Sequence, residues 1–177
     1  MSNHLEKYIG VYDNLVPIKV ISKTLKYFNQ VKNSDFEKGL VINDNNKNNP
    51  VQSEVRKVDV FRLSRSSKSL TQVYFYNILK KIILTGFGKY RIQNPYADIA
   101  RILEINILKY NQHGKYDYHT DHCFQAVRTL SAILLLNNDY DGGDLCFNLN
   151  NEECIIKKKA GRLILFPSNF LYPHRVS

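Results

Sequence analysis

The chain has 177 residues, of which 44% are hydrophobic and 23% are charged, a composition that excludes collagen, a coiled coil or wholesale disorder. This length suits one domain, residues 1–177, which buries most of its apolar surface without needing disulfides or metal ions for stability. No run of eighteen apolar residues occurs, so we expect no membrane partner. The first residues lack a basic segment followed by an apolar stretch, so we also expect no secretion.

The net charge of +9 is unevenly distributed. Residues 1–100 hold 16 Lys and Arg against 8 Asp and Glu, whereas residues 101–177 hold 9 against 8. The densest basic stretch, residues 56–68, would suit nucleic acid or an acidic partner, although we favour a solvated surface. The three cysteines are odd in number and form no CxxC pair, which favours reduced thiols in the cytoplasm over disulfides or a thiolate zinc site.

The first hundred residues predict helices and strands that support a later β unit. Residues 9–11 suit a short strand, and Pro17 begins an apolar helical pattern that reaches about Gln30. Residues 43–49 have the composition of an exposed loop, and residues 55–63 suit a strand. A second helix is expected from Leu70 to about Phe87, ended by Gly86 and Gly88.

From residue 100 onward, short apolar runs alternate with turn residues. Residues 137–143 and 148–152 indicate hairpin connections. Evenly spaced short strands favour a sandwich or a rolled barrel. The expected strands are 101–110, 116–119, 129–136, 144–149, 154–158, 162–166 and 171–176.

Three side chains of this region have the chemistry of a metal site. His119 and Asp121 are two residues apart at the end of a predicted strand, so both side chains lie on one face. His174 lies in another predicted strand and supplies a third ligand. Two histidines and one carboxylate on one side of a metal form the facial triad of non-haem Fe(II) oxygenases, which leaves positions open for a co-substrate and dioxygen. The alternative is that these are ordinary surface or capping residues.

Several ordered motifs give the region from about Tyr110 to Ser177 a resemblance to the 2-oxoglutarate- and Fe(II)-dependent dioxygenases, specifically to the prolyl 4-hydroxylase-like branch and its microbial and phage-type members. Ordered motifs at matching spacing are more specific than the HxD pair alone. They are Tyr110…Gly114…Tyr116…His119-Thr-Asp121, the run from Arg128 to Asn137, Asp141-Gly-Gly-Asp-Leu145, the run from Gly161 to Ser168, and His174-Arg-Val.

This resemblance implies an α+β, mainly β fold with a double-stranded β-helix (jelly-roll) core in residues 100–177 and supporting N-terminal helices in residues 1–99. It implies that His119, Asp121 and His174 bind iron and that Tyr110 donates a hydrogen bond to 2-oxoglutarate. Fe(II), 2-oxoglutarate and O2 are the expected cofactor and co-substrates, with ascorbate as an additional candidate. No side-chain general base is required, since the iron carries the oxidation.

The function implied is hydroxylation of a C–H bond in a prolyl or other residue of a peptide or protein, in the cytoplasm of the cell or, for a phage or viral protein, of its host. Two alternatives stay open: a degenerate, non-catalytic barrel that binds metal or a partner, and a nucleic-acid demethylase of the same chemistry. The oligomeric state is not predicted.

The sequence departs from the family pattern at two places. Relatives continue past the second histidine to a basic residue that pairs with the far carboxylate of 2-oxoglutarate, so we expect a truncated chain whose last barrel strand is missing. The alternatives are that Arg162 or Arg175 substitutes, or that co-substrate binding is impaired. Leu134 and Leu135 also stand where some relatives have a tyrosine.

Other polar residues near the motif have simpler interpretations. His113 and His122 are expected in loops, Tyr116 and Tyr118 as barrel-lining aromatics, and Arg128 in a structural ion pair in preference to a substrate contact.

Overall fold

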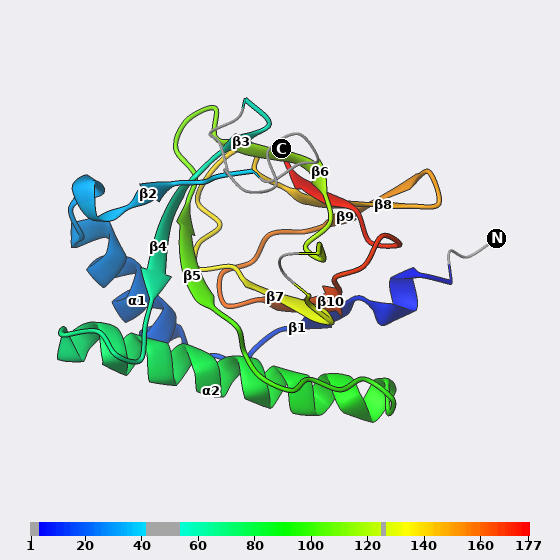
Figure 1. Cartoon of the computed structure of the whole chain (residues 1–177), viewed down its shortest axis with the longest axis horizontal. Helices are drawn as coiled ribbons and strands as arrows, with labels where there is room; N and C mark the ends of the chain where they lie inside the picture. Colours follow the sequence, from blue (N-terminus) through cyan, green and yellow to red (C-terminus); the bar gives the residue numbers. More distant parts are fainter. Residues whose placement is uncertain (1–3, 42–53, 125–126) are drawn as a thin grey trace.

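The computed structural model describes residues 4–41, 54–124 and 127–177. The loop predicted for residues 43–49 therefore lies outside the described residues. Two helices cover one side of a mainly β structure (Figure 1). In chain order the elements are η1 (Glu6–Tyr8), β1 (Gly10–Tyr12), α1 (Ile18–Gln30), η2 (Asn33–Asp35), β2 (Glu37–Lys38), β3 (Arg56–Lys57), β4 (Asp59–Leu63), α2 (Leu70–Gln93), β5 (Ile105–Lys109), β6 (Lys115–His119), β7 (Leu130–Leu134), β8 (Leu145–Leu149), β9 (Glu152–Ile156), β10 (Leu163–Pro167) and β11 (His174–Val176).

Within the described residues, the strands pair antiparallel in three sheets. Their orders are β1-β10-β7, β3-β6-β11-β8-β9 and β2-β4-β5. All seven strands predicted after residue 100 are present, with ends shifted by a few residues. The single strand predicted for residues 55–63 is instead two strands, β3 and β4. Val58 separates them, and they belong to different sheets.

One of the two predicted hairpins is confirmed. β8 and β9 pair directly, with Leu149 opposite Glu152, and the turn residues Asn150 and Asn151 both have positive φ, as a tight hairpin of this kind requires. The prediction for residues 137–143 is wrong, because β7 pairs with β10 while β8 belongs to the other sheet. That segment crosses between sheets, and turn-rich composition does not distinguish a crossing from a hairpin.

The helices form where apolar residues recur at helical spacing. Helix α1 follows Pro17 as predicted and buries Ile21, Thr24 and Phe28. Helix α2 begins after Ser69, whose side chain accepts a hydrogen bond from the Gln72 backbone N–H, a typical N-cap. Among the helices of the described residues, none combines the length and the apolar character that crossing a bilayer requires.

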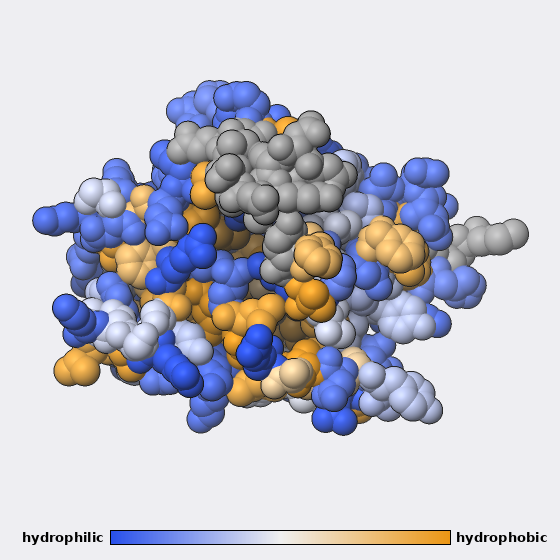
Figure 2. Space-filling model, viewed as in Figure 1, coloured by the Kyte–Doolittle hydropathy of each residue, from blue (hydrophilic) through white to orange (hydrophobic). Residues whose placement is uncertain are grey.

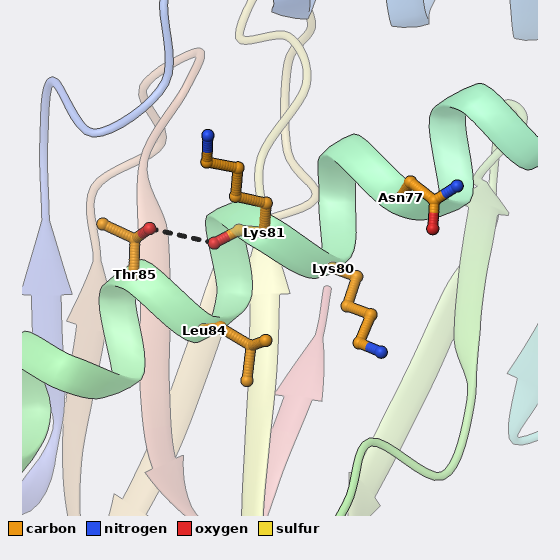
Figure 3. Close-up of a pocket in the computed structure, with 5 residues that line it drawn as sticks. All are labelled: Asn77, Lys80, Lys81, Leu84 and Thr85. Atoms are coloured by element: carbon orange, nitrogen blue, oxygen red, sulfur yellow. Dashed lines mark hydrogen bonds between the residues drawn. The ribbon is translucent and has the colours of Figure 1, made fainter.

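The predicted end of α2 near Phe87 is wrong, since the helix continues through Gly86 and Gly88 to Gln93. Gly86 faces the sheet, and a Cβ added there would stand 2.2 Å from Leu163 Cδ2. The glycine therefore permits close approach of helix and strand. A shallow hollow on α2 is lined by Asn77, Lys80, Lys81, Leu84 and Thr85, and none of the predicted metal ligands lines it (Figure 3).

Strand β10 divides the apolar interior into two clusters. Its residues Leu163 and Leu165 face the helices and pack with residues of α1, α2, β4 and β5. Its residues Ile164 and Phe166 face the opposite way and pack with β8 and Tyr172. This is the alternation expected of a strand buried on both faces. The second cluster lies between the sheets and supports the end of β11, where His174 stands.

Candidate metal centre

Adjacent strands bring the two predicted histidine ligands together. His119 is the last residue of β6, His174 is the first of β11, and the two are direct partners in the antiparallel pairing. Cross-strand partners have neighbouring side chains on one face, and the two imidazole centroids are 4.3 Å apart. Asp121 follows β6 by two residues, and one ligand atom from each of the three side chains lies within 4.8 Å of the others.

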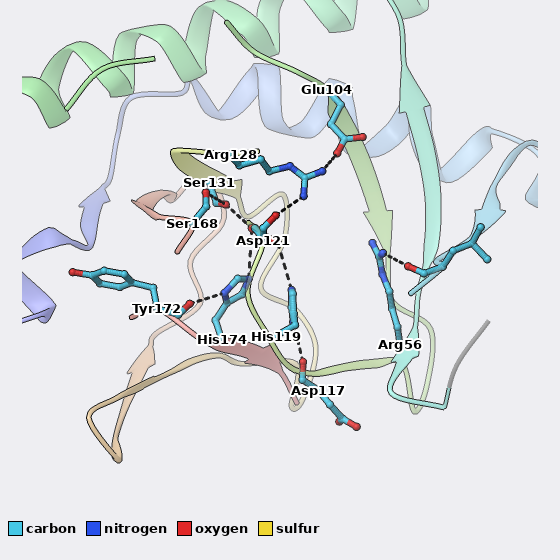
Figure 4. Close-up of polar contacts among 11 residues, drawn as sticks. Arg56, Glu104, Asp117, His119, Asp121, Arg128, Ser131, Ser168, Tyr172 and His174 are labelled. Atoms are coloured by element: carbon cyan, nitrogen blue, oxygen red, sulfur yellow. Dashed lines mark hydrogen bonds and ion pairs between the residues drawn. The ribbon is translucent and has the colours of Figure 1, made fainter. Parts of the chain in front are cut away.

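Both imidazoles are oriented by hydrogen bonds that leave one nitrogen available. His119 Nδ1 lies 2.9 Å from the Asp117 carbonyl oxygen, and His174 Nδ1 lies 3.2 Å from that of Tyr172 (Figure 4). Since a carbonyl oxygen only accepts, Nδ1 must carry the proton in each ring. The lone pair is then on Nε2, which lies 3.6 Å from Asp121 in His119 and 3.8 Å from Asp121 in His174. This is the tautomer that binds a metal.

Hydrogen bonds also fix Asp121. Ser131 on β7 donates to Asp121 Oδ2 at 2.5 Å, and its hydroxyl lies 2.8 Å from that of Ser168. Arg128 Nη1 donates to the Asp121 backbone oxygen at 2.9 Å and pairs with Glu104. Figure 4 shows these groups around the carboxylate. The expected structural ion pair of Arg128 is confirmed, and the arginine also anchors a ligand.

The electrostatics favour the metal-binding protonation states of Asp121 and His174 at neutral pH. Burial and then the neighbouring His119 lower the pKa of His174 to about 4. For Asp121, burial alone would raise the pKa, but the contacts with His119, His174 and Ser131 hold it well below the usual range. Asp121 is therefore a carboxylate and His174 a neutral imidazole, which are the forms that ligate metal.

Aromatic rings enclose His174. The rings of Phe166 and Phe147 lie 4.8 and 5.6 Å from its imidazole, centroid to centroid. Only 4% of the His174 side chain is exposed, against 16% for His119 and 26% for Asp121. The site is thus closed behind His174 and open toward Asp121. Apolar residues also gather around a hollow in the middle of the face that lies over β5 and β7 (Figure 2).

The structure places the other predicted residues outside this triad. His113 is exposed in the turn before β6, and His122 is exposed with its Nδ1 2.9 Å from the Arg128 oxygen. Tyr110 directly follows β5, and burial, with a smaller contribution from the charge of Asp121, raises its pKa to about 12. Tyr118 points outward, where its hydroxyl donates to Glu153.

Both arginines considered for the far carboxylate of a co-substrate are engaged elsewhere. Arg162 forms two hydrogen bonds of 2.9 Å with Asp13. Arg175 follows His174 on β11, so its side chain points to the opposite face, where it binds Glu153 at 2.9 Å. Neither guanidinium is turned toward the triad.

Sequence reasoning missed the residues that hold the ligands. Ser131 sits within an apolar run, Ser168 ends the Phe166-Pro-Ser run, and the carbonyls of Asp117 and Tyr172 carry no sequence signal. Only the three-dimensional structure shows that these groups converge on His119, Asp121 and His174.

Comparison with known proteins gives this geometry a family context. Residues 105–177 match the 2OG-Fe(II) oxygenase superfamily. A PKHD-type hydroxylase of Synechococcus sp. (strain CC9902) is 36% identical over 110 residues, which are 60% of this chain and 46% of that protein. The chain spans about half the length of the curated relatives it matches.

Solved structures share the fold. A prolyl hydroxylase from Trichoplax adhaerens, in complex with a hypoxia inducible factor peptide fragment, superposes with a TM-score of 0.78 at 16% identity and covers 97% of this chain and 77% of that one. A prolyl-4-hydroxylase from Pseudomonas putida gives a TM-score of 0.70 at 18% identity, with 96% and 85% covered. At these identities the comparison speaks to the fold alone, and it confirms the predicted jelly roll.

Proposed function

We propose that the protein is an Fe(II)- and 2-oxoglutarate-dependent dioxygenase, since its residues 105–177 match the 2OG-Fe(II) oxygenase superfamily. The observation that carries the proposal is the convergence of His119, Asp121 and His174 with both Nε2 atoms turned toward the carboxylate. Two imidazoles and one carboxylate are the donor set of non-haem Fe(II) oxygenases.

These three residues would hold Fe(II), while Ser131 and the carbonyls of Asp117 and Tyr172 keep the ligands in place. When bound, Fe(II) supplies the oxidising chemistry, in which O2 and 2-oxoglutarate are consumed and a C–H bond is hydroxylated. The chain contributes geometry and exclusion of water: Phe147 and Phe166 close the His174 side of the site.

Tyr110 is our proposed contact to 2-oxoglutarate. Burial raises the pKa of its hydroxyl to about 12, so the group stays protonated and able to donate a hydrogen bond at neutral pH. A phenol that donates to a carboxylate forms a charge-assisted hydrogen bond, which is stronger than a neutral one. Replacing Tyr110 with phenylalanine is expected to raise the KM for 2-oxoglutarate more than it lowers kcat.

The substrate we propose is a prolyl or other residue of a peptide or protein. This rests on similarity to a protein named a PKHD-type hydroxylase and on a shared fold with prolyl hydroxylases, one of them in complex with a peptide fragment. We also propose a reducing, cytoplasmic compartment, because Cys123, Cys146 and Cys154 are all free thiols.

The experiment that tests the proposal separates metal binding from turnover. Fe(II) binding is measured without oxygen by calorimetry, and succinate formation is then measured with 2-oxoglutarate, O2 and a pool of proline-containing peptides. Mass spectrometry of the peptides detects the gain of one oxygen atom. His119→Ala and Asp121→Ala are expected to abolish both binding and succinate formation, whereas His113→Ala, a change to an exposed histidine, leaves both unchanged.

Turnover that survives the Asp121→Ala substitution contradicts the proposal. Tight Fe(II) binding without succinate formation, at any peptide or 2-oxoglutarate concentration, would instead support the alternative of a non-catalytic metal-binding barrel.

A further inference from the structure

Tyr116 lies flat against the metal ligand His119. Their ring centroids are 3.4 Å apart and their planes differ by 14°. The contact is unexpected from the sequence, because residues three apart on a regular strand point to opposite faces. A tyrosine that only lined the barrel would not need to lie parallel to His119. The pairing of the strands accounts for this arrangement.

A bulge in β6 explains the contact. In the pairing of β6 with β11, His174 is opposite His119 while Val176 is opposite Tyr116. Two steps along β11 therefore match three steps along β6, so β6 carries one extra residue. Such a bulge turns the following side chains relative to the preceding ones, and it brings Tyr116 and His119 to the same face. Bulges of this kind often re-aim side chains beside functional sites.

Arg56 fixes Tyr116 from its other side. The two are direct partners in the pairing of β3 with β6, and the guanidinium carbon lies 4.6 Å from the Tyr116 ring centroid. Because the imidazole of His119 already covers one face of that ring, the guanidinium lies against the other. Arg56 is held in turn by a hydrogen bond from its Nη1 to the Leu40 carbonyl oxygen at 2.7 Å, the contact drawn at the right of Figure 4.

The hydrogen bond from His119 Nδ1 to the Asp117 carbonyl leaves one motion of the imidazole unrestrained. It selects the tautomer and the direction of Nδ1, but the ring can still tilt about the line of that bond. A ring stacked in parallel at 3.4 Å opposes such a tilt, since tilting would drive the imidazole edge into the Tyr116 ring. The stack therefore sets the plane in which Nε2 presents its lone pair.

We infer that Tyr116 is a positioning residue for the metal ligand His119, and that Arg56 acts through Tyr116 to keep the stack closed. The ring of Tyr116, and not its hydroxyl, does the positioning. This inference rests on the metal site of the proposed function. It assigns to the first half of the chain, through Arg56 on β3, a part in organising a site whose ligands all come from the second half.

The test measures metal affinity directly and compares matched variants of the full chain. Calorimetry with Mn(II), and the visible absorption spectrum with Co(II), are recorded for wild type, Tyr116→Leu, Tyr116→Phe and Arg56→Gln. Tyr118→Leu is the control, because it makes the same chemical change two residues away on the outward face of β6. Thermal unfolding of each metal-free variant shows whether the fold is retained.

Tyr116→Leu is expected to weaken Mn(II) binding by about 10–100-fold, the range found when groups that orient metal ligands are removed, and to change the Co(II) spectrum. Tyr116→Phe keeps the ring and is expected to bind like wild type. Arg56→Gln, which removes no ligand contact, is expected to weaken binding by less than Tyr116→Leu. Tyr118→Leu should leave both the affinity and the spectrum unchanged.

Three results would overturn the inference: wild-type affinity in both Tyr116→Leu and Arg56→Gln, an equal loss in Tyr118→Leu, or a loss in Tyr116→Phe as large as in Tyr116→Leu. If Tyr116→Leu does not fold, Arg56→Gln decides the matter, and wild-type affinity in that variant counts against the stack. Failure of the wild-type protein to bind either metal overturns the metal site itself and the inference with it, so the two failures are distinguishable.

Discussion

Gly86 and Gly88 offer a matched pair of substitutions on one helix. An alanine Cβ at position 86 would stand 2.2 Å from Leu163 Cδ2 and 3.4 Å from Leu165 Cδ1, whereas at position 88 it would meet nothing within 4 Å. Carbon atoms pack at about 3.5–4.0 Å, so Leu163 Cδ2 would have to retreat by roughly 1.5 Å. Leu163 is fully buried, with 0% of its surface exposed, and a close-packed interior resists such a shift.

The two substitutions should therefore have opposite signs. Replacing an interior helical glycine with alanine gains about 1 kcal/mol from helix propensity, and Gly88→Ala should show this gain. At Gly86 the same gain is opposed by an overpacking cost of about 1–3 kcal/mol, so Gly86→Ala should lose about 1 kcal/mol. The expected separation between the variants is about 2 kcal/mol.

Urea unfolding followed by circular dichroism measures this separation, provided that the m-values of the two variants agree. For a chain of this size, about 1 kcal/mol corresponds to a shift of roughly 2–4 °C in Tm. A Gly86→Ala protein as stable as Gly88→Ala would refute the argument, because it would mean that α2 and β10 are not in close contact at this point. The two faces of β10 would then no longer connect the packing of α2 with the apolar cluster beside His174.

Three further outcomes follow from the site and its surroundings. Ser131→Ala removes the hydrogen bond to Asp121 and should weaken Mn(II) binding about tenfold, as measured by calorimetry, while Ser131→Thr, which keeps a hydroxyl, should bind more tightly than the alanine variant. Mn(II) at about 100 times its Kd should stabilise the fold by about 2.7 kcal/mol, and a scan of Asp121→Ala that still shows this rise in Tm would contradict the triad. The hydrogen bonds of Arg162 hold the pKa of Asp13 well below its usual range, so that pair stabilises the protein above about pH 4, by about 1 kcal/mol at this partly exposed position. That contribution is lost as the pH falls through the lowered pKa, so Asp13→Asn should flatten the acid limb of the stability profile, and an unchanged limb would exclude the pair as its source.

The strand pattern of the second half was predictable because short apolar runs bounded by turn residues carry a strong local signal. Leu145–Leu149 and Glu152–Ile156 form the hairpin that Asn150 and Asn151 indicate. The segment at residues 137–143 has similar composition but crosses between sheets, since composition records the need for a turn and not the partner of the next strand. The end of α2 was misplaced for a related reason: Gly86 serves packing against Leu163, and a packing glycine looks the same in sequence as one that ends a helix.

The amino-acid sequence by itself determined the donor chemistry, because the ordered residue types around His119, Asp121 and His174 leave few other uses for two imidazoles and a carboxylate. The tertiary structure decided how those donors are held: which nitrogen is free, which serine supports the carboxylate, and which ring lies against His119. It also paired Arg162 with Asp13 and turned Arg175 outward, so neither stands beside the triad. The physical reason is that the two features depend on interactions of different range along the chain. Ligand identity resides in side chains that local spacing reveals, whereas orientation depends on carbonyls, a β-bulge and cross-strand partners that meet only when distant segments pair.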